Sequence, residues 1–140
     1  NAIVDNEEVT LMDWGNAIVK QITRDDTGKV VELSGVLNPG GSVKSTKKKL
    51  TWVAANDQVL VPVKIMSFDH IITKAKVEPT DNFEDIINYK SKHEELSVGD
   101  LNLKQLKQGE IIQLERRGYY RVDKAYESDE NSIVLINIPA

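Results

Sequence analysis

The sequence predicts an all-β protein, folded as a small antiparallel barrel or barrels with one short helix. Three observations support this prediction. Short apolar stretches alternate with polar residues at period 2, turn residues recur between them at regular spacing, and no strand–helix–strand alternation is present. With 140 residues, the chain can form one ordinary domain or two small barrels.

The N-terminal part is predicted to form a three-stranded meander. Glu8–Asp13, Ala17–Arg24 and Lys29–Leu37 alternate or are rich in β-branched residues. Trp14–Asn16 is the first predicted turn, and Asp25–Gly28 is the second, because Asp and Gly favour turn conformations.

A break in the chain follows at Asn38–Ser42, which is predicted to be a loop and a possible boundary. It leads into the lysine-rich stretch VKSTKKK at residues 43–49. Lysine is a flexible point charge that suits contact with a phosphate backbone. A solvated surface stretch fits these residues equally well.

The middle of the chain is predicted to continue as strands. Leu50–Ala54 is expected to bury Trp52, and Gln58–Met66 and Phe68–Val77 are apolar and β-branched. Pro62 lacks the N–H that a ladder needs, which predicts an edge strand or a bulge there.

One helix of about two turns is predicted to begin at Asp81 or Asn82, since both are good N-cap residues. Its apolar face consists of Phe83, Ile86 and Ile87. The polar stretch Lys90–Glu95 is expected to be exposed.

The C-terminal part is predicted to begin with a turn at Ser97–Asp100 and one helical turn at Leu101–Leu106, closed by Gly109. A β-hairpin is predicted over Glu110–Asp123, and Ser132–Ile138 is strongly β-forming.

The predicted hairpin, EIIQLERRGYYRVD, carries groups that bind phosphates, read base edges and stack on unpaired bases. Its turn is expected at Gly118. The groups belong to Gln113, Arg116, Arg117, Tyr119, Tyr120 and Arg121. Composition alone favours a merely solvated hairpin, because most charged strands are simply solvated.

Charge and composition exclude several classes of function. The net charge of −4 argues against a general nucleic-acid or DNA binder. The segment Lys104–Lys124 nevertheless contains six basic residues and only three acidic ones. No apolar run is long enough to span a membrane. Without cysteine, and with His70 and His93 outside any ligand spacing, we expect no disulfide or metal site. No serine has glycine on both sides, so a hydrolytic enzyme is not expected.

The hairpin motif QLERRGYYRVD resembles the last large motif in the anticodon-binding region of class I glutamyl- and glutaminyl-tRNA synthetases. The resemblance extends along the whole chain, through EVTLMDWGNAIV, the Asp-Asp turn with its following strand, and KKLTWVA followed by VLVPVKIMSFDHIIT. DNFEDIINYKSKHEELSVGD resembles an insertion of the eukaryotic glutamyl enzymes.

The resemblance implies two small barrels that grip the anticodon stem-loop of tRNA-Glu. Residues 1–50 would form part of the first barrel, incomplete at its N-terminal side, and residues 51–140 the second. Gln113 and Arg116 match positions that contact the central anticodon base in the glutaminyl relative. Further RNA-binding positions that it suggests are Arg117, Tyr119, Lys44 and Lys47. Met12 stands where the relative has a base-reading arginine, which puts that contact in doubt or moves it to neighbours such as Asp13 and Asn16.

The resemblance also implies a cytoplasmic whole enzyme that joins glutamate to tRNA-Glu with ATP and magnesium. This chain would carry no catalytic residue and bind neither cofactor. Two alternatives remain open from the sequence. One is a protein-interaction module that docks another synthetase or a scaffold protein, and the other is the anticodon-binding domain of a glutaminyl enzyme.

Overall fold

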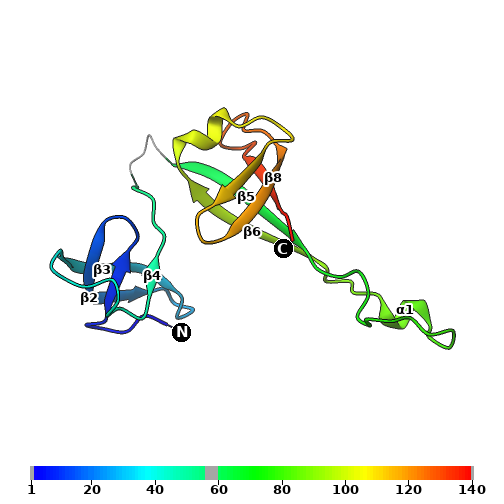
Figure 1. The fold of residues 1–140 in the computed structure, drawn as a ribbon, viewed down its shortest axis with the longest axis horizontal. Coiled ribbons are helices and arrows are strands. Elements are labelled where there is room, and N and C mark those ends of the chain that lie inside the picture. Colours follow the sequence, from blue (N-terminus) through cyan, green and yellow to red (C-terminus); the bar gives the residue numbers. More distant parts are fainter. Residues whose placement is uncertain (1, 56–59, 140) are drawn as a thin grey trace. The chain divides into compact units, whose positions relative to one another are not determined.

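A computed structural model describes residues 2–55 and 60–139. The chain divides into two compact units, Asn1–Trp52 (unit 1) and Val53–Ala140 (unit 2). Figure 1 follows the elements along the chain. In unit 1 these are β1 (Glu8–Leu11), β2 (Gly15–Arg24), β3 (Val30–Asn38) and β4 (Lys49–Leu50). In unit 2 they are β5 (Val61–Phe68), α1 (Phe83–Ile86), β6 (Lys92–Gly99), the 3-10 helix η1 (Leu101–Gln105), β7 (Ile111–Leu114), β8 (Gly118–Lys124) and β9 (Ile133–Asn137).

Unit 1 is a four-stranded sheet in the order β3-β2-β1-β4. β1, β2 and β3 form the predicted meander with antiparallel pairing, whereas β4 pairs with β1 in parallel. The predicted turn after β2 is confirmed: the Asp25 carboxylate accepts backbone bonds from Thr27 (2.9 Å) and Lys29 (3.0 Å), and Gly28 adopts φ +83°. β2 begins at Gly15, so the first turn lies slightly earlier than predicted.

The predicted burial of Trp52 is wrong. β4 pairs with β1 over two residues, Lys49 and Leu50, and the chain then leaves the sheet. Trp52 is 44% exposed. Its ring lies 4.8 Å from the ring of Trp14, and its indole N–H donates to the carbonyl oxygen of Met12 at 2.7 Å. Trp52 therefore covers the β1–β2 turn from outside instead of filling a core.

Unit 2 is a five-stranded sheet in the order β6-β5-β9-β8-β7. The pairing of β5 with β9 is parallel and the other pairings are antiparallel. The predicted C-terminal strand is confirmed as β9, in the centre of the sheet. One apolar cluster lies on the inner face of the sheet. It contains Val61, Val63, Ile65, Leu103, Tyr120, Val122, Ile133 and Leu135.

The position of Pro62 departs from the prediction, since β5 is an inner strand between β6 and β9. Pairing with β9 begins only at Val63, so Pro62 precedes that ladder and its missing N–H removes no bond from it. The predicted start of this strand, Gln58–Val59, lies outside the described residues.

An arm, residues 69–91, joins β5 to β6 and contains α1 (Figure 1). The strand predicted to run to Val77 stops at Phe68, because beyond it the chain has no continuous sheet neighbour. The two legs of the arm meet through a bridge between Ile72 and Ile87. The N-cap prediction at Asn82 is confirmed, since its side chain accepts from the backbone of Glu84, but α1 has one turn rather than two.

β6 was not expected from its sequence. The prediction placed a turn at Ser97–Asp100, but Ser97–Gly99 belong to β6. β6 is an edge strand whose side chains are mostly exposed, and Leu96 is 80% exposed, so it lacks the apolar alternation that marks a strand. The helical turn after it is confirmed as η1, but its C-cap is Leu106 and not Gly109.

Candidate nucleic-acid interface

The predicted hairpin is confirmed as β7 and β8, and its turn lies at Glu115–Arg117. The N–H of Arg117 donates to the carbonyl oxygen of Leu114 at 3.0 Å. Arg116 is the third residue of the four-residue turn that begins at Leu114, and its φ of +61° is a conformation that favours Gly or Asn. Gly118, the predicted turn residue, instead begins β8 with φ +107°. The backbone therefore holds an arginine at the tip of the hairpin. A residue with a side chain is strained in this left-handed conformation, which lowers the stability of the folded state.

The two faces of the hairpin follow the alternation of apolar and polar residues along its two strands. Tyr120 and Val122 are buried, and Ile112 and Leu114 pack against the same apolar cluster. The opposite face carries exposed polar side chains, and the register places Gln113 directly opposite Tyr119. Side chains at opposed positions of an antiparallel pair are neighbours on one face. An amide and an exposed phenol ring therefore lie side by side near the arginine turn.

Arg117, a sequence-predicted RNA contact, makes an ion pair inside the protein. Its guanidinium forks onto the carboxylate of Glu95, with Nη1–Oε1 at 3.1 Å and Nη2–Oε2 at 2.6 Å. Glu95 lies on β6, at one edge of the sheet, and the hairpin turn joins β7 and β8 at the other edge. The ion pair therefore links the two ends of the strand order. The carboxylate raises the pKa of Arg117, and the guanidinium lowers the pKa of Glu95. RNA would have to compete with Glu95 for this cation.

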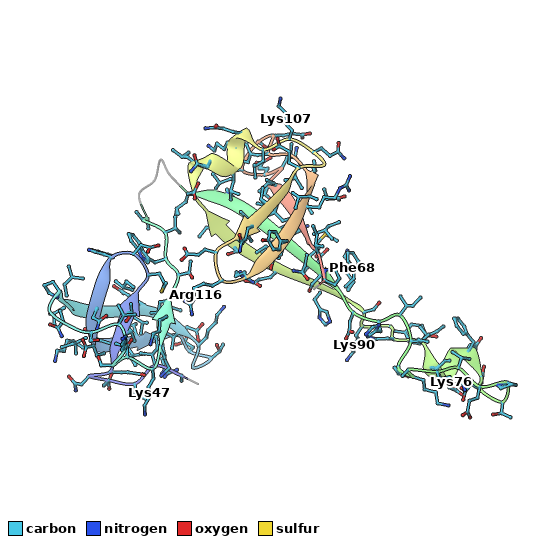
Figure 2. The ribbon with its side chains drawn as sticks, viewed as in Figure 1. Lys47, Phe68, Lys76, Lys90, Lys107 and Arg116 are labelled. Atoms are coloured by element: carbon cyan, nitrogen blue, oxygen red, sulfur yellow. The ribbon has the colours of Figure 1, made fainter. Side chains whose placement is uncertain are left out.

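The lysine-rich stretch of unit 1 presents two of its four ammonium groups outward. Lys48 binds Glu7 at 2.6 Å and thereby lowers the pKa of that carboxyl, and the ammonium of Lys49 donates to the carbonyl oxygen of Thr46. Lys44 and Lys47 are exposed, and Figure 2 shows Lys47 extending from its loop. These two are the lysines that the resemblance singles out.

A buried polar network holds this loop against β1 and β2. The side-chain oxygen of Asn16 accepts from the hydroxyl of Thr10 (2.8 Å), which bonds the hydroxyl of Thr46 (2.6 Å). The Asn16 amide donates to Glu8 (2.9 Å) and to the carbonyl oxygen of Ser42 (3.0 Å). The side chain of Asn16 is therefore fully engaged in hydrogen bonds within unit 1.

Gly41 explains why the loop fits so closely over this network. A Cβ at position 41 would lie 2.3 Å from the Glu8 carboxylate and 2.6 Å from the Asn16 amide. A larger residue at position 41 would force the side chains of Glu8 and Asn16, or the loop itself, to move.

The structure groups the sequence-predicted residues within each unit. Gln113, Arg116, Arg117 and Tyr119 share one hairpin of unit 2, and Lys44 and Lys47 share one loop of unit 1. Asn137 was not predicted, yet it lines a groove beside Tyr119. It lies at the end of an otherwise apolar strand, and the pairing of β8 with β9 places it opposite Tyr120.

Two classes of feature are absent from residues 2–55 and 60–139. No three His, Asp or Glu side chains gather there as metal ligands. No helix in this part of the chain is long and apolar enough to cross a membrane.

Comparison with known proteins identifies the family. Residues 49–123, which contain β5 to β7 and nearly all of β8, match the family described as tRNA synthetases class I (E and Q), anti-codon binding domain. The chain belongs to this family. The family membership inferred from the hairpin motif is thus confirmed. The matched segment includes the arm and the arginine turn.

Relatives of this anticodon-binding domain cover nearly the whole chain. It is 52% identical over 139 residues to the cytoplasmic glutamate–tRNA ligase of Arabidopsis thaliana, covering 99% of the chain and 19% of that ligase. It is 45% identical over 134 residues to the cytoplasmic glutamate–tRNA ligase of Saccharomyces cerevisiae, covering 96% of the chain and 18% of the ligase. The bifunctional glutamate/proline–tRNA ligase of Mus musculus is 37% identical over 142 residues, covering 96% of the chain and 9% of the ligase.

The chain therefore spans about a fifth of the length of the glutamate–tRNA ligases it matches. These relatives support the glutamyl branch of the family. The glutaminyl alternative and the protein-interaction alternative are not favoured.

Proposed function

We propose that this chain binds the anticodon stem-loop of tRNA-Glu as part of a cytoplasmic glutamate–tRNA ligase. The observation that carries the proposal is the exposed face of the β7–β8 hairpin, where Gln113 lies opposite Tyr119 beside the arginine turn. Unpaired RNA bases are recognised by such combinations of amide, guanidinium and aromatic groups. The hairpin also falls in the segment that matches the anticodon-binding family.

Five of the six predicted residues are distinguished by the contact that each can make, and Tyr119 adds an exposed aromatic ring to them. The Gln113 amide can donate to and accept from a base edge, and Arg116 can reach a base or a phosphate. Lys44 and Lys47 supply point charges for the phosphate backbone. Arg117 contributes less, because Glu95 already occupies its guanidinium.

The whole ligase would join glutamate to tRNA-Glu with ATP and magnesium, and those cofactors would bind outside this chain. We assign no catalytic residue to residues 1–140. Some relatives are named as bifunctional glutamate/proline ligases. Contacts with another synthetase domain or with a scaffold protein therefore belong to the proposal as secondary partners.

The decisive experiment measures binding of the 140-residue chain to tRNA-Glu and to an anticodon-swapped variant across a salt series. We expect tighter binding to the cognate anticodon, and affinity for both RNAs should fall with salt as phosphate contacts release counterions. Equal binding of both RNAs would restrict the chain to phosphate contact. The absence of binding would contradict the proposal.

Substitutions of Arg116 show whether it reads a base. Arg116→Gly removes the guanidinium and suits the positive φ of the turn, so the hairpin should persist. We expect it to weaken cognate binding by ~1–3 kcal/mol. Arg116→Lys, which keeps the charge but loses the planar fork, should restore part of the affinity and little of the discrimination.

Lys107→Ala is the matched control for the loss of one positive charge. Lys107 is exposed and lies at the other end of the unit 2 sheet from Arg116 (Figure 2). It should leave discrimination between the two RNAs unchanged. If Arg116→Gly lowers the affinity for both RNAs equally, Arg116 contacts a phosphate and not a base.

A further inference from the structure

The ion pair between Arg117 and Glu95 lies at the edge of the proposed RNA-binding face. Arg117 belongs to the hairpin turn and also lines the groove beside Tyr119. Glu95 reaches it from β6, with both carboxylate oxygens on the guanidinium, at 3.1 Å and 2.6 Å. A phosphate binds a guanidinium through the same two parallel hydrogen bonds. The carboxylate therefore occupies the position that an RNA phosphate would take on Arg117.

Strand pairing determines which carboxylate of β6 meets Arg117. The register sets Glu95 opposite Ile65, a buried member of the apolar cluster, and opposed side chains of an antiparallel pair share a face. Successive side chains of a strand point to opposite faces, so Glu94 lies on the other face of the sheet. Glu94 pairs with Lys92 there at 2.8 Å. Two adjacent carboxylates therefore have different cation partners.

The pair with Arg117 is open to solvent. The side chain of Arg117 is 41% exposed and that of Glu95 is 54% exposed. In the Lys48–Glu7 pair of unit 1, by contrast, the two side chains are 21% and 15% exposed. An ion pair in contact with water contributes little net free energy, because solvent and salt screen it. The Glu95 carboxylate is therefore a weak, exchangeable ligand, and its removal would open Arg117 to the phosphates of RNA.

A phosphate contact from Arg117 would add affinity without sequence information, since every nucleotide carries the same phosphate. Cognate RNA has its phosphates fixed by the base contacts that it makes on the hairpin. RNA without the cognate bases can shift until one of its phosphates meets an open guanidinium. An unopposed Arg117 would therefore favour non-cognate RNA more than cognate RNA. Groups that act against the wrong partner are a general source of specificity.

We propose that Glu95 is a specificity-determining residue, which takes the place of a phosphate on Arg117 and thereby lowers the affinity of the hairpin for non-cognate RNA. The inference rests on the proposed function and adds to it a residue that does not itself contact a base. In the bound state the Arg117–Glu95 pair stays intact, and the cognate RNA is held by the other groups of the hairpin.

The test compares the 140-residue chain with its Glu95→Gln variant, using tRNA-Glu and the anticodon-swapped RNA across a salt series. Glutamine keeps the shape of the side chain and removes its charge. One added phosphate contact steepens log affinity against log salt by about 0.7–0.9, or roughly 5- to 8-fold for each tenfold decrease in salt. We expect this steeper slope, and roughly 5- to 8-fold tighter binding of the swapped RNA at about 0.1 M salt. The cognate RNA should gain less, so discrimination should fall.

Glu94→Gln is the matched control, because it removes one negative charge from an ion-paired and similarly exposed neighbour of Glu95. It releases Lys92 instead of Arg117, so the salt slope and the discrimination should stay unchanged. Glu95→Gln combined with Arg117→Gln restores the net charge and removes the released cation. This double variant should return to the slope and the discrimination of the unsubstituted chain. Urea unfolding verifies that each variant is folded.

Each contrary result has a distinct meaning. If both RNAs bind but Glu95→Gln behaves like Glu94→Gln, the pair with Arg117 serves the sheet alone, and the inference fails while the proposed function stands. An equal gain for both RNAs would show an added phosphate contact without any role in specificity. Weaker cognate binding in Glu95→Gln would mean that Glu95 positions Arg117 for the RNA, which also overturns the inference. If neither RNA binds the unsubstituted chain, both proposals fail together.

Discussion

Unit 2 buries eight apolar side chains in one cluster, whereas the buried residues described in unit 1 are two valines and three polar residues. Both units are small sheets, but different interactions stabilise their interiors: mainly apolar contacts in unit 2 and mainly hydrogen bonds in unit 1. Apolar burial is non-directional and roughly proportional to area. A buried hydrogen-bond network contributes less net free energy, yet leaving one of its groups unpaired is expensive.

The difference corresponds to what each unit presents. The cluster of unit 2 supports a sheet that includes the β7–β8 hairpin and that continues into the arm. The network of unit 1 instead fastens one loop, and that loop presents Lys44 and Lys47. We infer that apolar packing keeps the hairpin rigid, while directional hydrogen bonds fix the position of the loop that carries the two lysines.

The chain carries natural probes that separate the two units. Both tryptophans, Trp14 and Trp52, lie in unit 1, and all four tyrosines lie in unit 2. Tryptophan emission therefore reports on unit 1, and near-ultraviolet tyrosine signals report largely on unit 2. Each prediction below can be followed in one unit with the other as an internal reference.

The largest effect is expected from Leu135→Ala in unit 2. Leu135 is fully buried in the cluster, so its truncation should lower the free energy of unfolding of this unit by ~2–5 kcal/mol. Urea unfolding followed by tyrosine signals should show it, with an unchanged tryptophan transition. Leu135→Met conserves volume and should cost under about 1.5 kcal/mol, which keeps the comparison measurable if the alanine variant is unfolded. A shared shift of both probes would show that the units unfold as one.

An intermediate effect is expected from Asn16→Ala in unit 1. It leaves the hydroxyl of Thr10 and the carbonyl oxygen of Ser42 without their amide partner, at a cost of ~1–3 kcal/mol. Tryptophan emission should report the loss, and tryptic cleavage after Lys44 and Lys47 should accelerate as the loop loosens. Lys20→Ala, an exposed change on the same strand, should stay within about 0.5 kcal/mol. An unchanged cleavage rate in Asn16→Ala would mean that other contacts hold the loop.

The smallest effect is expected from Glu95→Gln, which breaks the pair with Arg117. Both side chains are about half exposed, so the loss at neutral pH should be at most ~1 kcal/mol. Because the pair lowers the pKa of Glu95, its contribution is present above the pKa of the unfolded state. It disappears as the pH falls through the lowered, folded-state value. The difference in stability between the two proteins should therefore vanish in acid.

Glu130→Gln, at an exposed position, provides the control for removal of one negative charge. It should show no comparable pH-dependent difference. A difference that persists unchanged into acid would indicate that Glu95→Gln acts through packing and not through its charge.

Much of the fold could be predicted because local patterns decide it. Alternation in the β7–β8 hairpin assigns its buried and exposed faces correctly, and Asp25 with Gly28 specifies a turn that needs no distant contact. Elements that depend on distant partners were missed. β6 forms because β5 lies beside it, and Trp52 is exposed because β4 ends after two residues.

The candidate site divides in the same way. Gln113 and Tyr119 could be predicted to share a face from the alternation within one hairpin. The ion pair of Arg117 with Glu95 could not be predicted, because Glu95 is 22 residues away along the chain and comes close to Arg117 only in the folded protein. Asn137 was hidden for a related reason, since its neighbours in sequence are apolar and its neighbours in space come from β8.

The left-handed conformation of Arg116 has a consequence for laboratory evolution of this domain. An arginine there destabilises the turn relative to glycine or asparagine, so a screen that rewards thermal resistance alone should replace it early. Such a screen would remove the positive charge at the tip of the hairpin while raising the thermal stability of the domain. Libraries intended to harden the domain should therefore hold position 116 constant, or select for RNA retention in the same round.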